Sequence, residues 1–336
     1  MKKNRLERRA ALRGMGATLL AGAFALTGLA AHAQSNYPGD RPISVIVPFA
    51  AGGPTDNVAR SIGEAMRAKL GTTLVVENKV GAGGTIGTSY VARANPDGYT
   101  VLLTHIGFST APALYKNPGY DPIAGFEPIG MVVDVPSTVI ARDNFPADDV
   151  PSFIAYLKAN GEKVSIGNAG VGSASHLCGT MLMDSLGVKL LPVPYTGTAP
   201  AMNDLLGKQI DIMCDQVTNT TPYIQSNKVK SYAATSLQRV AVLPKLPTLD
   251  ESGVKGFQVG IWHGMWAPKG TPKPVVDKLV AALQAAVSDP TFQKRMTTLG
   301  AIPLPDRANP KALDEQVRGQ VKQWGDLFQK VGLQPQ

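Results

Sequence analysis

Cysteine and histidine are scarce in this chain of 336 residues. It has two cysteines, Cys178 and Cys214, and four scattered histidines. No C-x-x-C pair and no cluster of histidines is present, which excludes the common thiol redox and zinc motifs. None of its glycine-rich turns is followed by the lysine of a P-loop, and no G-x-S-x-G elbow occurs. We therefore expect neither a metal nor any other cofactor.

Charged residues are also sparse, at 17% of the chain, and much of the formal net charge of +8 comes from the N-terminus. Residues 1–33 hold six Lys/Arg and one acid, so 27 basic and 24 acidic residues remain, a net charge of +3. No basic cluster with interleaved aromatic residues remains, so nucleic-acid binding has little support. The apolar share of 44%, with 35 glycines and 26 prolines, is typical of an α/β chain with many strand-to-helix junctions.

Long apolar runs are absent except near the N-terminus, where residues 15–29 follow a basic segment and precede Ala31-His32-Ala33. This is the pattern of a cleavable signal peptide over residues 1–33, with cleavage near Ala33. The apolar core is short and ends in small residues, which disfavours a permanent membrane helix. Arg8-Arg9 leaves the twin-arginine route open, but general secretion is favoured. We therefore expect an exported protein.

Three glycine-rich segments each follow a strand-like run and precede a helical pattern. They lie at residues 47–56, 78–84 and 167–173. Glycine lets a ligand approach the main chain, and the first turn of a helix carries unpaired N–H groups at the positive end of its dipole. One such turn is as often an ordinary junction as a binding site. Three of them favour an anion site built from main-chain donors.

The order of elements predicts a parallel sheet with helices between its strands. Strands are expected at 43–46, 74–78 and 99–104, separated by helices at 57–70 and 85–94. Parallel neighbours need such crossovers, and ligands bind at the carboxyl ends of the strands. Segments 49–56, 78–84 and 104–110 are therefore expected to share one rim.

A second α/β unit is expected after an extended crossing segment at 129–141. It has strands at 164–166, 190–194, 210–213 and 229–235, with helices at 150–159, 175–186, 202–206 and 221–226. The chain then crosses back near Ser236, and helices at 274–299 and 310–331 cover the first unit. This predicts lobe 1 from 34–136 and 237–336, lobe 2 from 137–236, and a cleft that closes by a hinge.

The glycine turns and several later motifs resemble the Bug, or TctC-type, family of periplasmic solute-binding proteins of tripartite tricarboxylate transporters. The resemblance covers nearly all of the mature chain, with the motifs in the family's order. They are VPFAAGGPTD at 47–56, ENKVGAGG at 77–84, GVGSASHL at 170–177, YTGTAPA at 195–201, DLLG at 204–207 and WAPKGTP at 266–272. His176-Leu177-Cys178-Gly179 and the segment 213–221 are most similar to the BugD-like subgroup, which is associated with aspartate.

The resemblance implies a type II periplasmic-binding-protein-like α/β fold, in which two lobes joined by two crossover strands trap a small carboxylate. The protein would be a periplasmic monomer without enzymatic activity or cofactor, delivering its ligand to a two-subunit membrane permease. An amino-dicarboxylate such as aspartate is favoured, and another di- or tricarboxylate is an alternative. A solute sensor that docks to a signalling receptor is a further alternative. The implied ligand-binding residues are Phe49, Ala50, Gly53, Thr55, Asp56, Gly81, Ala82, Gly83, Thr104, Gly170, Ser173, His176, Tyr195, Thr198 and Asp215.

Several of these residues have an ordinary structural interpretation beside the functional one. Asp56 lies where an acid stabilises the start of a helix, Thr198 where it would cap one, and Tyr195 is also consistent with a packed core tyrosine. Asp215 follows a strand and is the better partner for a ligand ammonium group. Its charge would repel a tricarboxylate and favour an amino-dicarboxylate.

Ser173, Ser175 and His176 also permit a secreted serine hydrolase as a less favoured alternative. A catalytic triad requires spatial convergence, which proximity in sequence does not provide. His176 is equally consistent with local bonding at a helix start. Cys178 and Cys214 are consistent either with one disulfide, which an oxidising compartment permits, or with two buried thiols.

Overall fold

The computed structural model describes residues 37–330 and residue 335, so the predicted signal peptide at 1–33 lies outside the described residues. The unit from Asp40 onward is a mixed α/β fold built on one ten-stranded sheet. Among the residues described, no helix is both long and apolar enough to cross a membrane.

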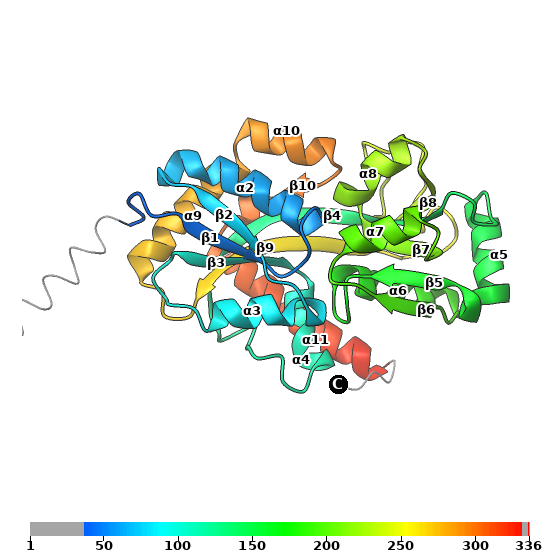
Figure 1. The fold of residues 1–336 in the computed structure, drawn as a ribbon, viewed down its shortest axis with the longest axis horizontal. Coiled ribbons are helices and arrows are strands. Elements are labelled where there is room, and N and C mark those ends of the chain that lie inside the picture. The colour runs from blue at the N-terminus through cyan, green and yellow to red at the C-terminus, as the bar shows by residue number, and fades with distance from the viewer. Residues whose placement is uncertain (1–36, 331–334, 336) are drawn as a thin grey trace, which may run out of the picture. The chain divides into compact units, whose positions relative to one another are not determined.

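The first elements alternate between strand and helix, as predicted (Figure 1). They are β1 (Ile43–Val47), α2 (Pro54–Leu70), β2 (Leu74–Asn78), η1 (Ala82–Gly84), α3 (Thr85–Ala92), β3 (Thr100–His105) and α4 (Gly107–Leu114). Strand β1 pairs in parallel with β2 and β3, which confirms the predicted parallel arrangement at this end. Helix α4 occupies a segment predicted as part of the rim. Its apolar face packs against the core, and this packing outweighs the weak helix propensity of glycine, threonine and the internal Pro112.

Two long strands, β4 (Phe126–Arg142) and β9 (Gly260–Pro268), run antiparallel through the middle of the sheet. Strand β9 also pairs antiparallel with β3. The sheet is therefore mixed, where the spacing of helices and strands predicted only parallel neighbours. Both strands are almost entirely buried, so neither shows the alternation that marks a half-exposed antiparallel strand.

A second set of elements follows β4 (Figure 1). They are α5 (Val150–Asn160), η2 (Gly161–Lys163), β5 (Ser165–Asn168), α6 (Ala174–Leu186), β6 (Leu191–Pro194), α7 (Thr198–Leu206), β7 (Ile212–Gln216), α8 (Val217–Gln225) and β8 (Val229–Ala234). Strand β5 pairs in parallel with β6 and β7, and β7 and β8 pair antiparallel with β4. The predicted elements are present, and β7 extends past the predicted end at residue 213.

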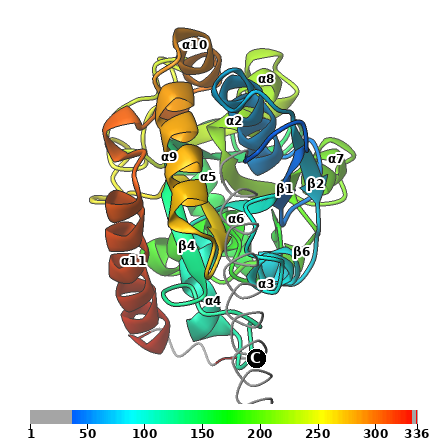
Figure 2. The same ribbon diagram turned by 90° about the vertical axis from the view of Figure 1, so that its left-hand side faces the viewer.

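The chain ends with α9 (Lys273–Val287), α10 (Pro290–Thr298), β10 (Ile302–Pro303), η3 (Pro305–Arg307) and α11 (Pro310–Lys330). The single helix predicted at 274–299 is wrong, because the chain breaks into two helices at Ser288–Asp289. Asp289 caps α10 by accepting a hydrogen bond from Phe292 N–H, and Pro290 begins the new helix. Helix α9 packs on α2, and α11 packs on α4 and β4 (Figure 2).

The hydrogen-bond partners of β4 change along its length. Up to Pro136 it pairs with β9, and from Ser137 it pairs with β7. We call the part built on β1, β2, β3, β9 and β10 the first lobe and the part built on β5 to β8 the second lobe. The predicted boundary after residue 136 falls at this change of partner, and it stays a prediction. On the return path Leu249 N–H donates to Ala234 O, which favours a second boundary nearer Val259 than the predicted residue 236.

Candidate ligand site between the lobes

The first glycine turn joins β1 to α2 and leaves the start of that helix without a side-chain cap. Gly53 is the N-cap residue in an extended conformation, and Pro54 occupies the first helical position. The next N–H groups of the helix have no partner within it, and they lie at its positive end. Phe49, Ala50, Gly53 and Thr55 line a cavity between the two lobes. The turn is therefore suited to a carboxylate.

Asp56 is almost fully buried and uses both carboxylate oxygens inside the first lobe. Its Oδ2 accepts hydrogen bonds from Gly52 N–H (3.0 Å) and Arg60 Nε (2.8 Å). Its Oδ1 accepts from Arg60 Nη2 and Asn78 Nδ2, both at 3.0 Å. Burial would raise the pKa of Asp56, but the hydrogen bonds from Arg60, Gly52 and Asn78 together hold the pKa below its usual value. Asp56 positions the ends of β1 and β2, and it does not line the cavity.

The second glycine turn lies at the lobe interface and outside the cavity lining. Gly81, Ala82 and Gly83 all have positive φ, at 127°, 45° and 61°. A side chain on Gly83 would overlap the carbonyl oxygen of Val171 in the second lobe. Glycine is required here by its backbone conformation and by the close approach of the third glycine turn, whose Gly170 lies against Gly83.

The third glycine turn leads into α6, whose first residues bond to the local main chain. Ser173 Oγ accepts a hydrogen bond from His176 N–H (3.3 Å), and Ser175 Oγ accepts one from Ala169 N–H (2.9 Å). His176 Nδ1 accepts from Gly172 N–H (3.3 Å), and burial lowers the pKa of His176. The structure does not assemble a serine–histidine pair here. Ser175 lines the cavity, whereas Ser173 and His176 do not.

Asp215 carries the carboxylate of the second lobe that faces the cavity. It lies in β7, one residue before Gln216, which occupies the N-cap position of α8. Asp215 is 1% exposed. Asn219 Nδ2 donates to Asp215 Oδ2 at 2.6 Å. Burial raises the pKa of Asp215 to about 6, and the hydrogen bonds from Asn219 and Gln216 N–H offset only part of the increase. No basic side chain among the described residues forms an ion pair with Asp215.

The cavity brings together residues from both lobes and has a volume of about 10 Å³. This is room for about one water molecule, so any larger ligand requires the lobes to separate. Gln216 Oε1 is buried in its wall without a hydrogen-bond partner among the described residues, and the buried Thr198 hydroxyl faces the Asp215 carboxylate. The lining residues are Phe49, Ala50, Gly53, Pro54, Thr55, His105, Ala169, Ala174, Ser175, Thr198, Asp215 and Gln216.

Two further predicted residues, Thr104 and Tyr195, lie outside the cavity lining. Thr104 is buried in β3, and its neighbour His105 reaches the cavity instead, because successive side chains of a strand point to opposite faces. Tyr195 donates its hydroxyl to Asp204 Oδ2 (2.7 Å) and packs against the core of the second lobe. Thr198 is the first residue of α7, and the N-cap residue is Gly197.

The predicted ligand-binding residues omit three polar residues of the lining, His105, Ser175 and Gln216. His105 stacks on Phe49 with ring centroids 4.5 Å apart and lies next to His263, which in turn is 3.3 Å from Thr55 Oγ1. Burial, with the neighbouring His263, holds the pKa of His105 well below its usual value, so the ring is neutral. Two features of the sequence could have identified His105 and Gln216. Side chains alternate in direction along β3, and β7 continues to residue 216.

Cys178 of α6 and Cys214 of β7 form a disulfide, with their Cα atoms 5.8 Å apart. Both residues are fully buried. The bond ties α6, which begins at the third glycine turn, to the strand that carries Asp215.

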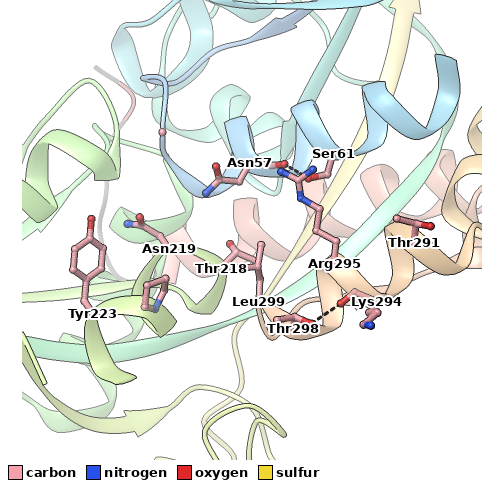
Figure 3. A pocket seen from close by; sticks show the side chains of 12 residues that line it. Asn57, Ser61, Thr218, Asn219, Tyr223, Thr291, Lys294, Arg295, Thr298 and Leu299 are labelled. Atoms are coloured by element: carbon pink, nitrogen blue, oxygen red, sulfur yellow. Dashed lines mark hydrogen bonds between the residues drawn. The ribbon is translucent and has the colours of Figure 1, made fainter. Parts of the chain in front are cut away.

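A second cavity, of about 650 Å³, adjoins helices of both lobes (Figure 3). Asn57 and Ser61 of α2 lie on one side, Asn219 of α8 on another, and Arg295 of α10 also reaches it. None of the predicted ligand-binding residues lines this cavity. In the described part of the chain, no group of three or more His, Cys, Asp or Glu side chains is placed to hold a metal ion.

Known proteins similar to this chain share both its sequence and its fold. A curated protein of Agrobacterium vitis, the UPF0065 protein in the TAR-I ttuE-ttuC' intergenic region, is 45% identical over 303 residues, or 90% of this chain and 87% of that protein. The structure of the periplasmic binding protein BugD is 67% identical, has a TM-score of 0.87, and covers 89% of this chain and 100% of its own. MatC from Rhodopseudomonas palustris with bound malate is 39% identical, with a TM-score of 0.83 over 87% of this chain and 99% of that one.

The family model described as "Tripartite tricarboxylate transporter family receptor", TctC, matches residues 58–333. The match spans most of the chain and agrees with the solved structures, which are solute-binding proteins rather than enzymes. The predicted two-lobed periplasmic-binding-protein fold is thereby confirmed, and the chain belongs to the TctC family of tripartite tricarboxylate transporter receptors, together with the Bug periplasmic solute-binding proteins.

Proposed function

We propose that this periplasmic solute-binding protein captures an amino-dicarboxylate of the aspartate type between its two lobes. The observation that carries the proposal is the arrangement of donors and acceptors around the cavity. The first lobe presents the uncapped start of α2, and the second presents the Asp215 carboxylate. A ligand with a carboxylate at one end and an ammonium group facing Asp215 would complement both walls.

Gln216 and Thr198 extend the same argument. Gln216 Oε1 is buried beside Asp215 without a hydrogen-bond partner among the described residues, and the Thr198 hydroxyl, which faces Asp215, offers a further acceptor. A buried polar atom without a hydrogen bond is costly, and a ligand ammonium group would supply up to three donors to this wall. A ligand that carries only carboxylates would leave Gln216 Oε1 unpaired and would be repelled by ionised Asp215. A tricarboxylate is therefore disfavoured.

The MatC relative was solved with malate, which has a hydroxyl group where aspartate has its ammonium group. The two ligands have the same carbon chain and the same two carboxylates. Discrimination between them at this site would therefore come from Asp215 and its neighbours. We propose that one ligand carboxylate is bound by Phe49, Ala50, Gly53 and Thr55. The other groups of the ligand would be bound by Asp215, Gln216 and Thr198.

Thermal unfolding with matched ligands tests the proposal. L-Aspartate, L-malate and succinate differ only in the substituent on one carbon, and citrate adds a third carboxylate. At a hundred times its dissociation constant a ligand adds about 2.7 kcal/mol of stability. We expect the order aspartate, malate, succinate, citrate. Asp215→Asn should remove the preference for aspartate over malate. Stabilisation by none of the four would contradict the proposal, and an unchanged order in Asp215→Asn would contradict the role of Asp215.

We further propose delivery of the ligand to a two-subunit permease by a monomeric receptor. The family to which the chain belongs supports this step. Transport of labelled ligand into vesicles that contain the permease pair should require this protein. If a sensor protein is captured by the liganded form while the permease is not, signalling would be its function instead.

A further inference from the structure

We infer that Tyr115 and Thr110 form a latch that holds the two lobes closed without touching the ligand. Tyr115 Oη donates a hydrogen bond to the carbonyl oxygen of Val171 at 2.8 Å. Thr110 Oγ1 lies 3.2 Å from the carbonyl oxygen of Gly172, and it shares its one proton between this oxygen and that of Gly107 in its own helix, 3.0 Å away. Both donors belong to α4 and the residue that follows it, in the first lobe. Both acceptors belong to the third glycine turn, in the second lobe. We call these four residues the α4 latch.

The latch is held firmly on the first lobe. Phe108 of α4 stacks on the buried Trp266 of β9, with ring centroids 4.4 Å apart. Tyr120 Oη donates to the main-chain oxygen of Phe108 at 3.2 Å, and α11 packs along α4. Because α4 cannot shift independently of the sheet, a bond from α4 to the third glycine turn ties one lobe to the other.

The third glycine turn enters a slot that leaves no room for extra atoms. A Cβ on Gly107 would lie 2.7 Å from Gly172 O, and one on Gly83 would overlap Val171 O. Leu114 Cδ1 lies 3.2 Å from the position of a Cβ on Gly172. Such close packing on both sides of the turn directs the two carbonyl groups toward their donors, and it requires full closure before either hydrogen bond forms.

None of the latch residues lines the cavity. The latch therefore contributes to closure by the same amount for every ligand. It acts on the lifetime of the closed protein and not on the choice of ligand. Tyr115 is therefore a positioning residue: it holds the lobes together and so affects how long a ligand stays bound, without touching the ligand. The inference rests on the proposed function only where a ligand is used to measure it.

Tyr115→Phe tests the latch, because it removes one hydroxyl group and keeps the ring. Tyr232→Phe is the matched control, since it also removes a hydrogen bond to a main-chain oxygen, that of Ala147 at 2.8 Å, but within the second lobe. One hydrogen bond corresponds to about a fivefold change in rate. We expect the dissociation rates of L-aspartate and L-malate from Tyr115→Phe to rise by about fivefold, by the same factor for both ligands. A change in the ratio of the two rates, or an effect equal to that of Tyr232→Phe, would overturn the inference.

A ligand-free measurement separates the latch from the identity of the solute. Both native cysteines are in the disulfide, so Glu64→Cys on α2 and Glu162→Cys in η2 can be spin-labelled specifically. We expect the ligand-free protein to show a closed distance, and Tyr115→Phe to lower the ratio of closed to open molecules by about fivefold relative to Tyr232→Phe. An unchanged ratio, or no closed population in the parent protein, would overturn the latch. If neither probe binds but the ratio changes, the proposed solute is wrong and the latch stands.

Discussion

At Asp215, burial and ligand recognition place opposite demands on one carboxylate. The residue is 1% exposed, and no basic side chain in the described part of the chain neutralises it. Burial disfavours the charged form, which raises the pKa to about 6. A ligand ammonium group would favour the charged form again. Asp215, the residue that would select the ligand, therefore destabilises the closed protein when no ligand is bound.

This conflict predicts a specific dependence of stability on pH. The ordinary pKa of an aspartate is 3.8, so between about pH 4 and pH 6 the folded protein holds a proton that the unfolded chain has lost. Stability therefore falls as the pH rises through this window and is constant above it. Asp215→Asn should leave stability near pH 4 unchanged and increase it at pH 7 by up to about 3 kcal/mol. Urea unfolding of both proteins from pH 4 to pH 7 measures this, and equal curves throughout would contradict it.

Asp56 represents the opposite case, a buried carboxylate whose hydrogen bonds are complete. Asp56→Ala would leave Gly52 N–H without this partner and one hydrogen of Asn78 Nδ2 unpaired, since the other donates to Phe49 O, and it should cost about 2–4 kcal/mol. Asp277→Ala, which removes an exposed i,i+4 ion pair with Lys273 on α9, should cost less than about 0.5 kcal/mol. Denaturant unfolding compares the two. Similar costs for both variants would show that Asp56 does not anchor the turn.

At the scale of elements, the three glycine turns have different tasks. The first presents main-chain donors to the cavity, the second is the surface against which the second lobe closes, and the third carries the carbonyl groups of the α4 latch. Their sequences are similar, yet the first contributes five residues to the lining of the ligand cavity, the third contributes Ala169 and the second none. The difference arises from the position of each turn relative to the opposite lobe.

Gly83→Ala should therefore block closure without unfolding the protein. Its positive φ costs an alanine about 1 kcal/mol, and the added methyl group would overlap Val171 O. Gly71→Ala provides the same backbone strain at a φ of 72°, with no atom within 4 Å of the new methyl group. We expect similar losses of stability but at least a tenfold loss of ligand affinity in Gly83→Ala alone, measured by calorimetry. Equal affinities in the two variants would exclude closure at this point.

At the scale of the whole molecule, the Cys178–Cys214 disulfide constrains the lobe that carries Asp215. It closes a loop with a sequence separation of 36 residues, for which chain entropy predicts about 3–4 kcal/mol. The double variant Cys178→Ala/Cys214→Ala should lose about that much unfolding free energy. Because the bond lies within the second lobe, closure should still occur. A loss below about 1 kcal/mol in denaturant unfolding would contradict the expected contribution.

Much of the element order and the first glycine turn followed from the sequence alone. Glycine and proline at 52–54 mark the junction of β1 and α2 wherever the rest of the chain lies, because their backbone preferences are local. The same holds for Asp215 near the end of a buried strand. The signal peptide pattern at 1–33 is also local, and it stays a prediction because those residues lie outside the described structure.

Tertiary structure alone decided which residues of these segments face the ligand and which face the other lobe. It turned His105 and not Thr104 toward the cavity, used Asp56 as an anchor, and brought Tyr115 to Val171, 56 residues further along the chain. Periodicity in a sequence reports how a segment buries its own apolar side chains. It contains no information on the approach of two lobes, because that contact depends on how all the elements pack together.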